Sequence, residues 1–224
     1  DLTDELHNEL GFEVKKDEEL EIKEVRDTIN KLRAKNLDDD SFIKKFSDIF
    51  KENKMESISE GTFFSSILFI SALDETNKIE IFLEKFENAE SPQMQGRYRA
   101  VLGQVRDQNA SKKIVEFMLD GRIRGADCPY ILASMITNKY IGKKSWKVIK
   151  ENFNDLLSVM PDWTASRILD ALPAIYDEEF ADDIKNFIKK NPLPSSEKLA
   201  AQKLERLEAN IEFMDNLKEV NNET

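Results

Sequence analysis

Residues 38–50, with the sequence DDDSFIKKFSDIF, carry the clearest structural signal in the chain. The aspartates and Ser41 offer side-chain oxygens that accept hydrogen bonds from the first free amides of a helix. The apolar residues that follow recur at three- and four-residue steps and so share one helix face: Phe42, Ile43, Phe46, Ile49 and Phe50. This stretch predicts a capped amphipathic helix with a phenylalanine-rich buried face.

The same periodicity continues along the chain. Residues 17–36 show it with acidic residues early and basic residues late, as the helix dipole favours. Further helices are predicted at 59–73, 78–86, 92–104, 110–119, 128–137, 143–160, 164–172, 178–189 and 195–217. No stretch alternates apolar and polar residues as a half-buried strand does. We therefore expect an all-α protein: a curved, HEAT-like α-solenoid of antiparallel helix pairs, forming a single domain over residues 1–224.

Charge is unevenly distributed. The 224 residues carry a formal charge of −11, which argues against nucleic acid as a partner, because binding to phosphates requires a concentrated basic surface. Residues 97–150 nevertheless contain 12 lysines and arginines and four acids, a net +8, so the remainder carries −19. This basic segment is interpreted either as a site for an anionic ligand or acidic neighbour, or as ordinary solvated helix faces.

The sequence also bears on location. The longest apolar stretch, residues 63–73, is far shorter than the roughly 20 residues that span a bilayer, so we expect no membrane association. The first residues show no secretory or organelle signal. Cys128 is the single cysteine, which fits a reducing compartment, and we expect it to be a small buried apolar residue. These features predict a cytoplasmic location.

Few residues could support catalysis. A zinc peptidase helix requires two histidines one turn apart, and His7 is the only histidine. His7 lies in a polar helical stretch, where we expect an exposed structural role; a solitary hydrolase that uses His7 is the less favoured alternative. The glycines form no known nucleotide-binding loop. We therefore predict no catalytic residue, no metal ligand and no cofactor in this chain, which should be inactive alone.

Three separated motifs carry a resemblance to a known family. The first is LHNELGFE at residues 6–13, followed by Glu24-Val25-Arg26. The second is RIRGAD at 122–127, then IGKKSW at 141–146 and Asn152-Phe153. The third is LERLEANIEF at 204–213. In this order the motifs resemble the C-terminal helical domain of the M1 family of zinc aminopeptidases.

The resemblance implies a division of labour. The zinc, its ligands and the catalytic groups of the family lie in a separate catalytic domain, which would be the partner of this chain in one polypeptide. The helical domain would enclose the substrate chamber, gate its entry and hold the distal end of peptides that are cleaved from their N-terminus. A free-standing α-solenoid that acts as a protein-binding scaffold remains the alternative.

The basic segment then acquires a possible role. A peptide held by its amino end at the zinc would present its C-terminal carboxylate to basic side chains, for which Arg124, Lys139 and Lys143 are the candidates. The competing interpretation is that Arg124 and Asp127 pin their turn by local pairing. Asp127 is in either case the predicted structural residue of that turn.

Overall fold

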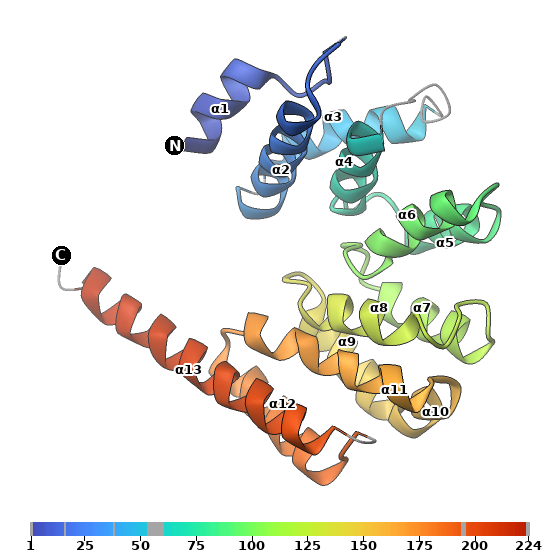
Figure 1. Cartoon of the computed structure of the whole chain (residues 1–224), viewed down its shortest axis with the longest axis vertical. Helices are drawn as coiled ribbons and strands as arrows, with labels where there is room; N and C mark the ends of the chain where they lie inside the picture. The colour runs from blue at the N-terminus through green and yellow to red at the C-terminus, as the bar shows by residue number, and fades with distance from the viewer. Residues whose placement is uncertain (1, 16, 38, 53–60, 194–195, 223–224) are drawn as a thin grey trace. The chain divides into compact units, whose positions relative to one another are not determined.

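The computed structural model describes residues 2–15, 17–37, 39–52, 61–193 and 196–222. Within these residues it contains α-helices and one 3-10 helix, η2, but no strand (Figure 1). The all-α prediction is therefore confirmed. By its contacts the chain divides into two compact units, Asp1–Ala110 and Ser111–Thr224, and each is described by itself. The single domain and its curvature stay predictions.

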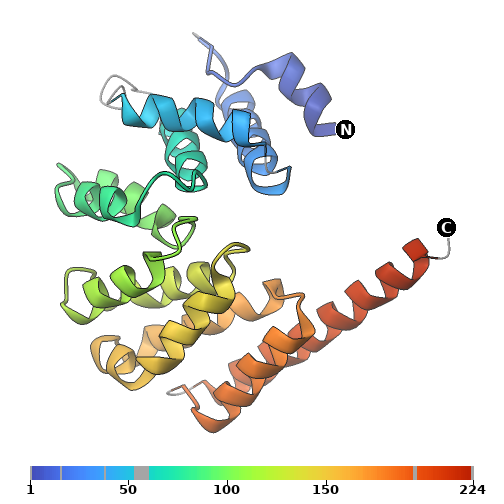
Figure 2. The same ribbon diagram turned by 180° about the vertical axis from the view of Figure 1, so that it is seen from behind.

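The first unit is built from six helices within the described residues. They are α1 (Leu2–Leu10), α2 (Leu20–Asn36), α3 (Asp40–Lys51), α4 (Gly61–Ala72), α5 (Ile79–Glu87) and α6 (Pro92–Leu102). Helix α4 packs against α2, α3 and α6, and α5 packs against α6. Figures 1 and 2 show α5 and α6 side by side, and their short connection makes them run in opposite directions.

Helix α3 shows how the opening motif folds. The Asp39 side chain caps the helix by accepting a hydrogen bond from the Phe42 amide at 3.0 Å, as the sequence predicted. Asp38 lies outside the described residues. Phe42, Phe46 and Phe50 are buried, and the ring of Phe50 stacks on that of Phe82 with 5.1 Å between centroids. The phenylalanine face therefore forms much of the core of this unit.

The second unit contains the remaining elements. They are α7 (Ala110–Leu119), α8 (Cys128–Ile136), α9 (Gly142–Glu151), α10 (Phe153–Val159), α11 (Asp162–Ala165), η2 (Ser166–Ala174), α12 (Glu178–Lys190) and α13 (Glu197–Asn222). Helix α8 packs against α9 and η2, and α13 packs against η2 and α12. The rings of Trp146 and Phe153 both meet Phe187 edge-on, at centroid distances of 5.2 and 5.0 Å.

Two predicted helices differ from those observed. The prediction of one continuous helix over 143–160 is wrong, because the helix is interrupted at Asn152. The side-chain amide of Asn152 donates a hydrogen bond to the Val148 carbonyl at 2.8 Å. Asparagine favours such breaks since its side chain competes for backbone hydrogen bonds. The predicted helix at 164–172 is largely the 3-10 helix η2, which contains Pro173. The predicted starts at Ser59 and Ser195 lie outside the described residues.

Candidate functional site

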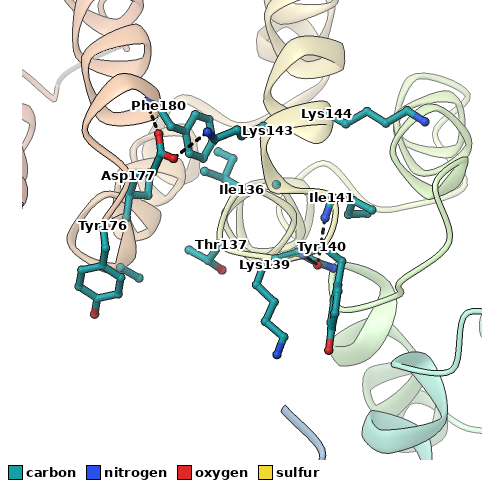
Figure 3. A pocket seen from close by; sticks show the side chains of 14 residues that line it. Ile136, Thr137, Lys139, Tyr140, Ile141, Lys143, Lys144, Tyr176, Asp177 and Phe180 are labelled. Carbon is teal, nitrogen blue, oxygen red and sulfur yellow. Dashed lines mark hydrogen bonds and ion pairs between the residues drawn. The ribbon is translucent and has the colours of Figure 1, made fainter. Parts of the chain in front are cut away.

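A pocket of about 480 Å³ lies in the second unit, between two loops (Figure 3). One loop joins α8 to α9, and the other joins η2 to α12. Ligand sites in proteins usually enclose about 300–1,000 Å³, so this pocket is large enough for a small ligand or one end of a peptide. Its lining includes Lys139, Lys143 and Lys144, which fall in the basic segment.

Asn138 shapes the loop between α8 and α9. Its buried side-chain oxygen accepts hydrogen bonds from the amides of Tyr140, at 2.9 Å, and Ile141, at 3.4 Å. The backbone carbonyl of Asn138 accepts a further bond from the Gly142 amide at 2.7 Å. A loop tied to one buried residue at three points is held in one conformation, and Lys139 and Tyr140 project from it.

Gly142 brings α9 close to the end of α8. A Cβ atom at this position would lie 2.4 Å from the Ile136 carbonyl oxygen, well inside van der Waals contact. Any other residue would push the start of α9 away from α8, because the obstacle is backbone rather than a flexible side chain. Gly142 lines the pocket, so the packing of α9 against α8 at this part of the pocket requires glycine.

An ion pair across the pocket joins the start of α9 to the loop before α12. Lys143 Nζ lies 2.7 Å from Asp177 Oδ2, and the other oxygen of Asp177 caps α12 by accepting from the Phe180 amide at 2.8 Å. The hydrogen bond from Lys143 lowers the pKa of Asp177, with help from the Phe180 amide, and the same bond raises the pKa of Lys143. Both groups are therefore charged at neutral pH, and Asp177 partly neutralises Lys143.

Lys139 and Lys144, the other two lysines that line the pocket, point in different directions from Lys143 (Figure 3). Figure 3 shows Lys139, Tyr140 and Tyr176 extending in the same general direction from the two loops, whereas Lys144 points away from Lys143. Lys139 Nζ lies 4.9 Å from the centre of the Tyr140 ring, and Tyr176 is 52% exposed. An ammonium group beside one tyrosine ring, with a second, exposed tyrosine on the other loop, can attract a ligand that combines a negative charge with an apolar part.

Arg124 and Asp127 lie in the turn before α8. Arg124 Nε donates to Asp127 Oδ2 at 2.9 Å; the Arg124 side chain is 75% exposed, whereas that of Asp127 is 12% exposed. Neither residue lines the pocket. The structure thus brings Lys139 and Lys143 together at one site and leaves Arg124 in a local pair with Asp127.

A smaller pocket of about 210 Å³ runs between α9 and α12. Here Asp183 accepts hydrogen bonds from Trp146 Nε1 at 3.0 Å and from Lys150 Nζ at 2.5 Å. The polar groups of this smaller pocket therefore bond α9 to α12 and are already used within the protein. The larger pocket is the better candidate for a ligand.

One comparison with known proteins bears on this site. The model of the family described as the ERAP1-like C-terminal domain matches residues 1–209, most of the chain. The chain belongs to this family. The membership confirms the resemblance to the C-terminal helical domain of an M1 aminopeptidase that its sequence motifs carry.

In this ERAP1-like C-terminal domain, His7 is not the exposed residue that we expected. Its ring is half-buried and meets the Phe42 ring edge-on, with 5.3 Å between centroids. Burial lowers the pKa of His7, and the positive charges of Arg33 and Lys45 lower it further. The structure therefore gives His7 a packing role between α1 and α3.

The single cysteine of the ERAP1-like domain is buried as well. Cys128 is fully buried, and burial raises the pKa of its thiol to about 12. Within the described residues no three His, Cys, Asp or Glu side chains are grouped to hold a metal ion. The same part of the chain has no helix with the length and apolar character needed to cross a bilayer. A zinc ion in a separate catalytic domain stays a prediction.

The sequence reasoning missed several residues of the pocket. Tyr140 gave a weak signal as an aromatic residue next to Lys139 and just before the Ile141-Gly142 turn. Tyr176 and Asp177 gave none, because they belong to a loop more than thirty residues further along the chain. Phe180 gave no signal as a pocket residue, yet it is half-buried and lines both pockets.

Proposed function

We propose that this chain is a non-catalytic domain of a zinc aminopeptidase that encloses part of the substrate chamber and binds the distal end of peptide substrates. The zinc and the catalytic groups would lie in another domain of the same polypeptide, so residues 1–224 alone would be inactive. Membership of the ERAP1-like C-terminal domain family supports this role. The pocket between the two loops supplies the candidate contact with the peptide.

The observation that carries the proposal is the chemistry of the pocket. Lys139, Lys143 and Lys144 line it against a single carboxylate, that of Asp177, so its rim has a net positive charge. A peptide that is held by its amino end has a free carboxylate at its other end, next to one side chain. Lys139 is suited to the carboxylate, and the rings of Tyr140 and Tyr176 are suited to an apolar side chain.

The scaffold alternative is less well supported. A scaffold that binds protein along its surface should carry a row of exposed aromatic residues or of one-signed charge. The large exposed aromatics of the second unit are instead spread over α8, the η2–α12 loop, α11 and α13: Tyr130, Tyr176, Trp163 and Phe213. Helix α2 exposes the apolar side chains of Leu20, Ile22, Val25 and Leu32, and such a surface favours a domain that is part of a larger protein.

The test uses the full-length enzyme and a pair of peptides that differ only in a C-terminal carboxylate or carboxamide. Lys139→Met should raise KM for the acid about two- to fivefold, because a partly exposed ion pair contributes about 0.5–1 kcal/mol. KM for the amide and turnover of a single-residue reporter substrate should not change. The control is Lys189→Met, since Lys189 is exposed and lies outside both pockets. Unchanged discrimination between acid and amide in Lys139→Met would contradict the proposal.

A further inference from the structure

The chain contains one histidine, His7, which the proposed function does not use. Histidine is the side chain whose ordinary pKa, about 6.5, puts its change of charge between about pH 5 and pH 8. The single cysteine does not change its charge in this range, because burial raises the pKa of Cys128 to about 12. His7 is therefore the position at which a modest fall in pH would add a charge to this protein.

His7 lies where α1 meets α2 and α3. Its half-buried ring stands edge-on to Phe42 of α3, and the Arg33 guanidinium of α2 lies 5.6 Å from the centre of the same Phe42 ring. The Nδ1 atom of His7 is buried and has no hydrogen-bond partner among the described residues. Packing rather than a hydrogen bond fixes this nitrogen, and a charge on the ring would be only partly hydrated.

The charged groups that face His7 are mainly positive. Arg33 extends from α2 and Lys45 from α3, whereas α1 itself contributes the carboxylate of Asp4. Asp4 already forms an ion pair with Arg33, and Asp39, which caps α3, lies 3.9 Å from the same guanidinium. The hydrogen bond from Arg33 lowers the pKa of Asp4, so this carboxylate keeps its charge in mildly acidic solution. Protonated His7 would therefore be a third cation at the junction of the three helices.

The docked position of α1 favours the neutral ring of His7. Burial is the largest cause that lowers the pKa of His7, and the charges of Arg33 and Lys45 lower it further. The neighbouring amide of Asn30 and the charge of Asp4 act in the opposite direction and more weakly. If α1 leaves α2 and α3, these influences are lost and the pKa of His7 returns toward its ordinary value. Undocked α1 therefore binds the proton more tightly than docked α1.

Helix α1 is attached lightly enough for one charge to matter. Among its residues 3–10, no side chain is fully buried. Its ties to α2 include the Asp4–Arg33 pair and hydrogen bonds from Arg26 to the Leu10 carbonyl at 3.2 and 3.1 Å. Elements with few buried contacts open at a small fraction of the free energy of global unfolding. Protonation of one half-buried ring is therefore sufficient to shift the balance between docked and undocked α1.

We propose that His7 makes the docking of α1 dependent on pH: α1 packs against α2 and α3 while the ring is neutral and is released when the ring is protonated. Because the pKa of His7 is lower in docked α1 than in undocked α1, docking is complete above about pH 6.5 and weakens as the pH falls below that value. The proposal does not rest on the proposed function, since the pocket lies in the other unit.

The test measures amide hydrogen exchange in the 224-residue chain at about pH 7.5 and pH 5.5, with each rate corrected for the intrinsic effect of pH. Protection of the α1 amides should fall at least about threefold at the lower pH, while protection of α5 in the same unit stays constant. In His7→Phe, which keeps a ring against Phe42 but cannot be protonated, protection of α1 should not change. Constant protection in the wild type, or an equal fall in both proteins, would overturn the proposal.

A second measurement uses the single imidazole signal in a proton NMR titration. Lys45→Met should raise the pKa of His7, because one of the two facing cations is removed. Lys44→Met is the matched control, since Lys44 is also exposed on α3 but is not among the charges that act on His7. The same pKa of His7 in Lys45→Met and Lys44→Met would show that the facing charges do not control the ring, contrary to the proposal.

Discussion

Replacement of Gly142 by alanine tests the physical basis of the pocket. The added Cβ would lie 2.4 Å from the Ile136 carbonyl oxygen and 3.3 Å from its carbon. A separation of 3.0 Å, the least that real Cβ atoms show, requires a displacement of about 0.6 Å between α8 and α9. Overpacking of this kind costs about 1–3 kcal/mol. The loss of glycine freedom in the unfolded chain offsets about 0.4–1 kcal/mol of that cost.

The net effect of Gly142→Ala should be a destabilisation of about 1–2 kcal/mol, which lowers Tm by about 2–8 °C in a protein of this size. Thermal unfolding followed by far-ultraviolet circular dichroism measures the shift. The matched control is Gly96→Ala, within α6, where an added Cβ meets nothing within 4 Å. Gly96→Ala should stabilise the protein by about 0.5–1 kcal/mol, the helix-propensity difference. The reasoning is refuted if Gly142→Ala is as stable as the wild type.

Three further predictions concern single side chains. Burial raises the pKa of Asp74, but hydrogen bonds from Ser47, Thr76 and Lys51 outweigh it and lower this pKa to about 2. The stability that ionised Asp74 contributes is therefore present at neutral pH and lost between about pH 4 and pH 2. Asp74→Asn should be less stable than the wild type at pH 7. Urea titrations should show this difference in the free energy of unfolding shrinking as the pH falls from 4 to 2. Asp177→Ala should lose the α12 cap and about 1 kcal/mol of folding stability, whereas Asp177→Asn should keep the cap. Equal chemical denaturation midpoints for the two variants would contradict the cap geometry. Cys128, whose pKa is about 12, should resist thiol reagents at pH 8 until urea unfolds the chain, and rapid labelling of the native protein would show that it is accessible.

The sequence predicted the helices well where its signals are local. The Asp39 cap and the phenylalanine face of α3 depend on residues within a few positions of one another, and the structure confirms both. The prediction failed at Asn152 and at the 3-10 helix η2, where a helical pattern of apolar residues continues through a break. Apolar periodicity shows which face is buried, but it does not show where backbone hydrogen bonds change partners. The prediction that His7 is exposed failed for a related reason. Its polar neighbours in the sequence do not reveal that its ring packs on Phe42 of another helix.

By itself, the amino-acid sequence determined the all-helical class, the net negative charge with its basic middle segment, and the family, because each of these depends on composition, periodicity or motif order along the chain. Only the tertiary structure decided which charged residues share a site. Lys143 meets Asp177 across 34 positions of sequence, and Arg124 remains in its own turn although it is equally basic. Such long-range pairs depend on how helices pack and where Gly142 lets them approach, which local spacing does not encode.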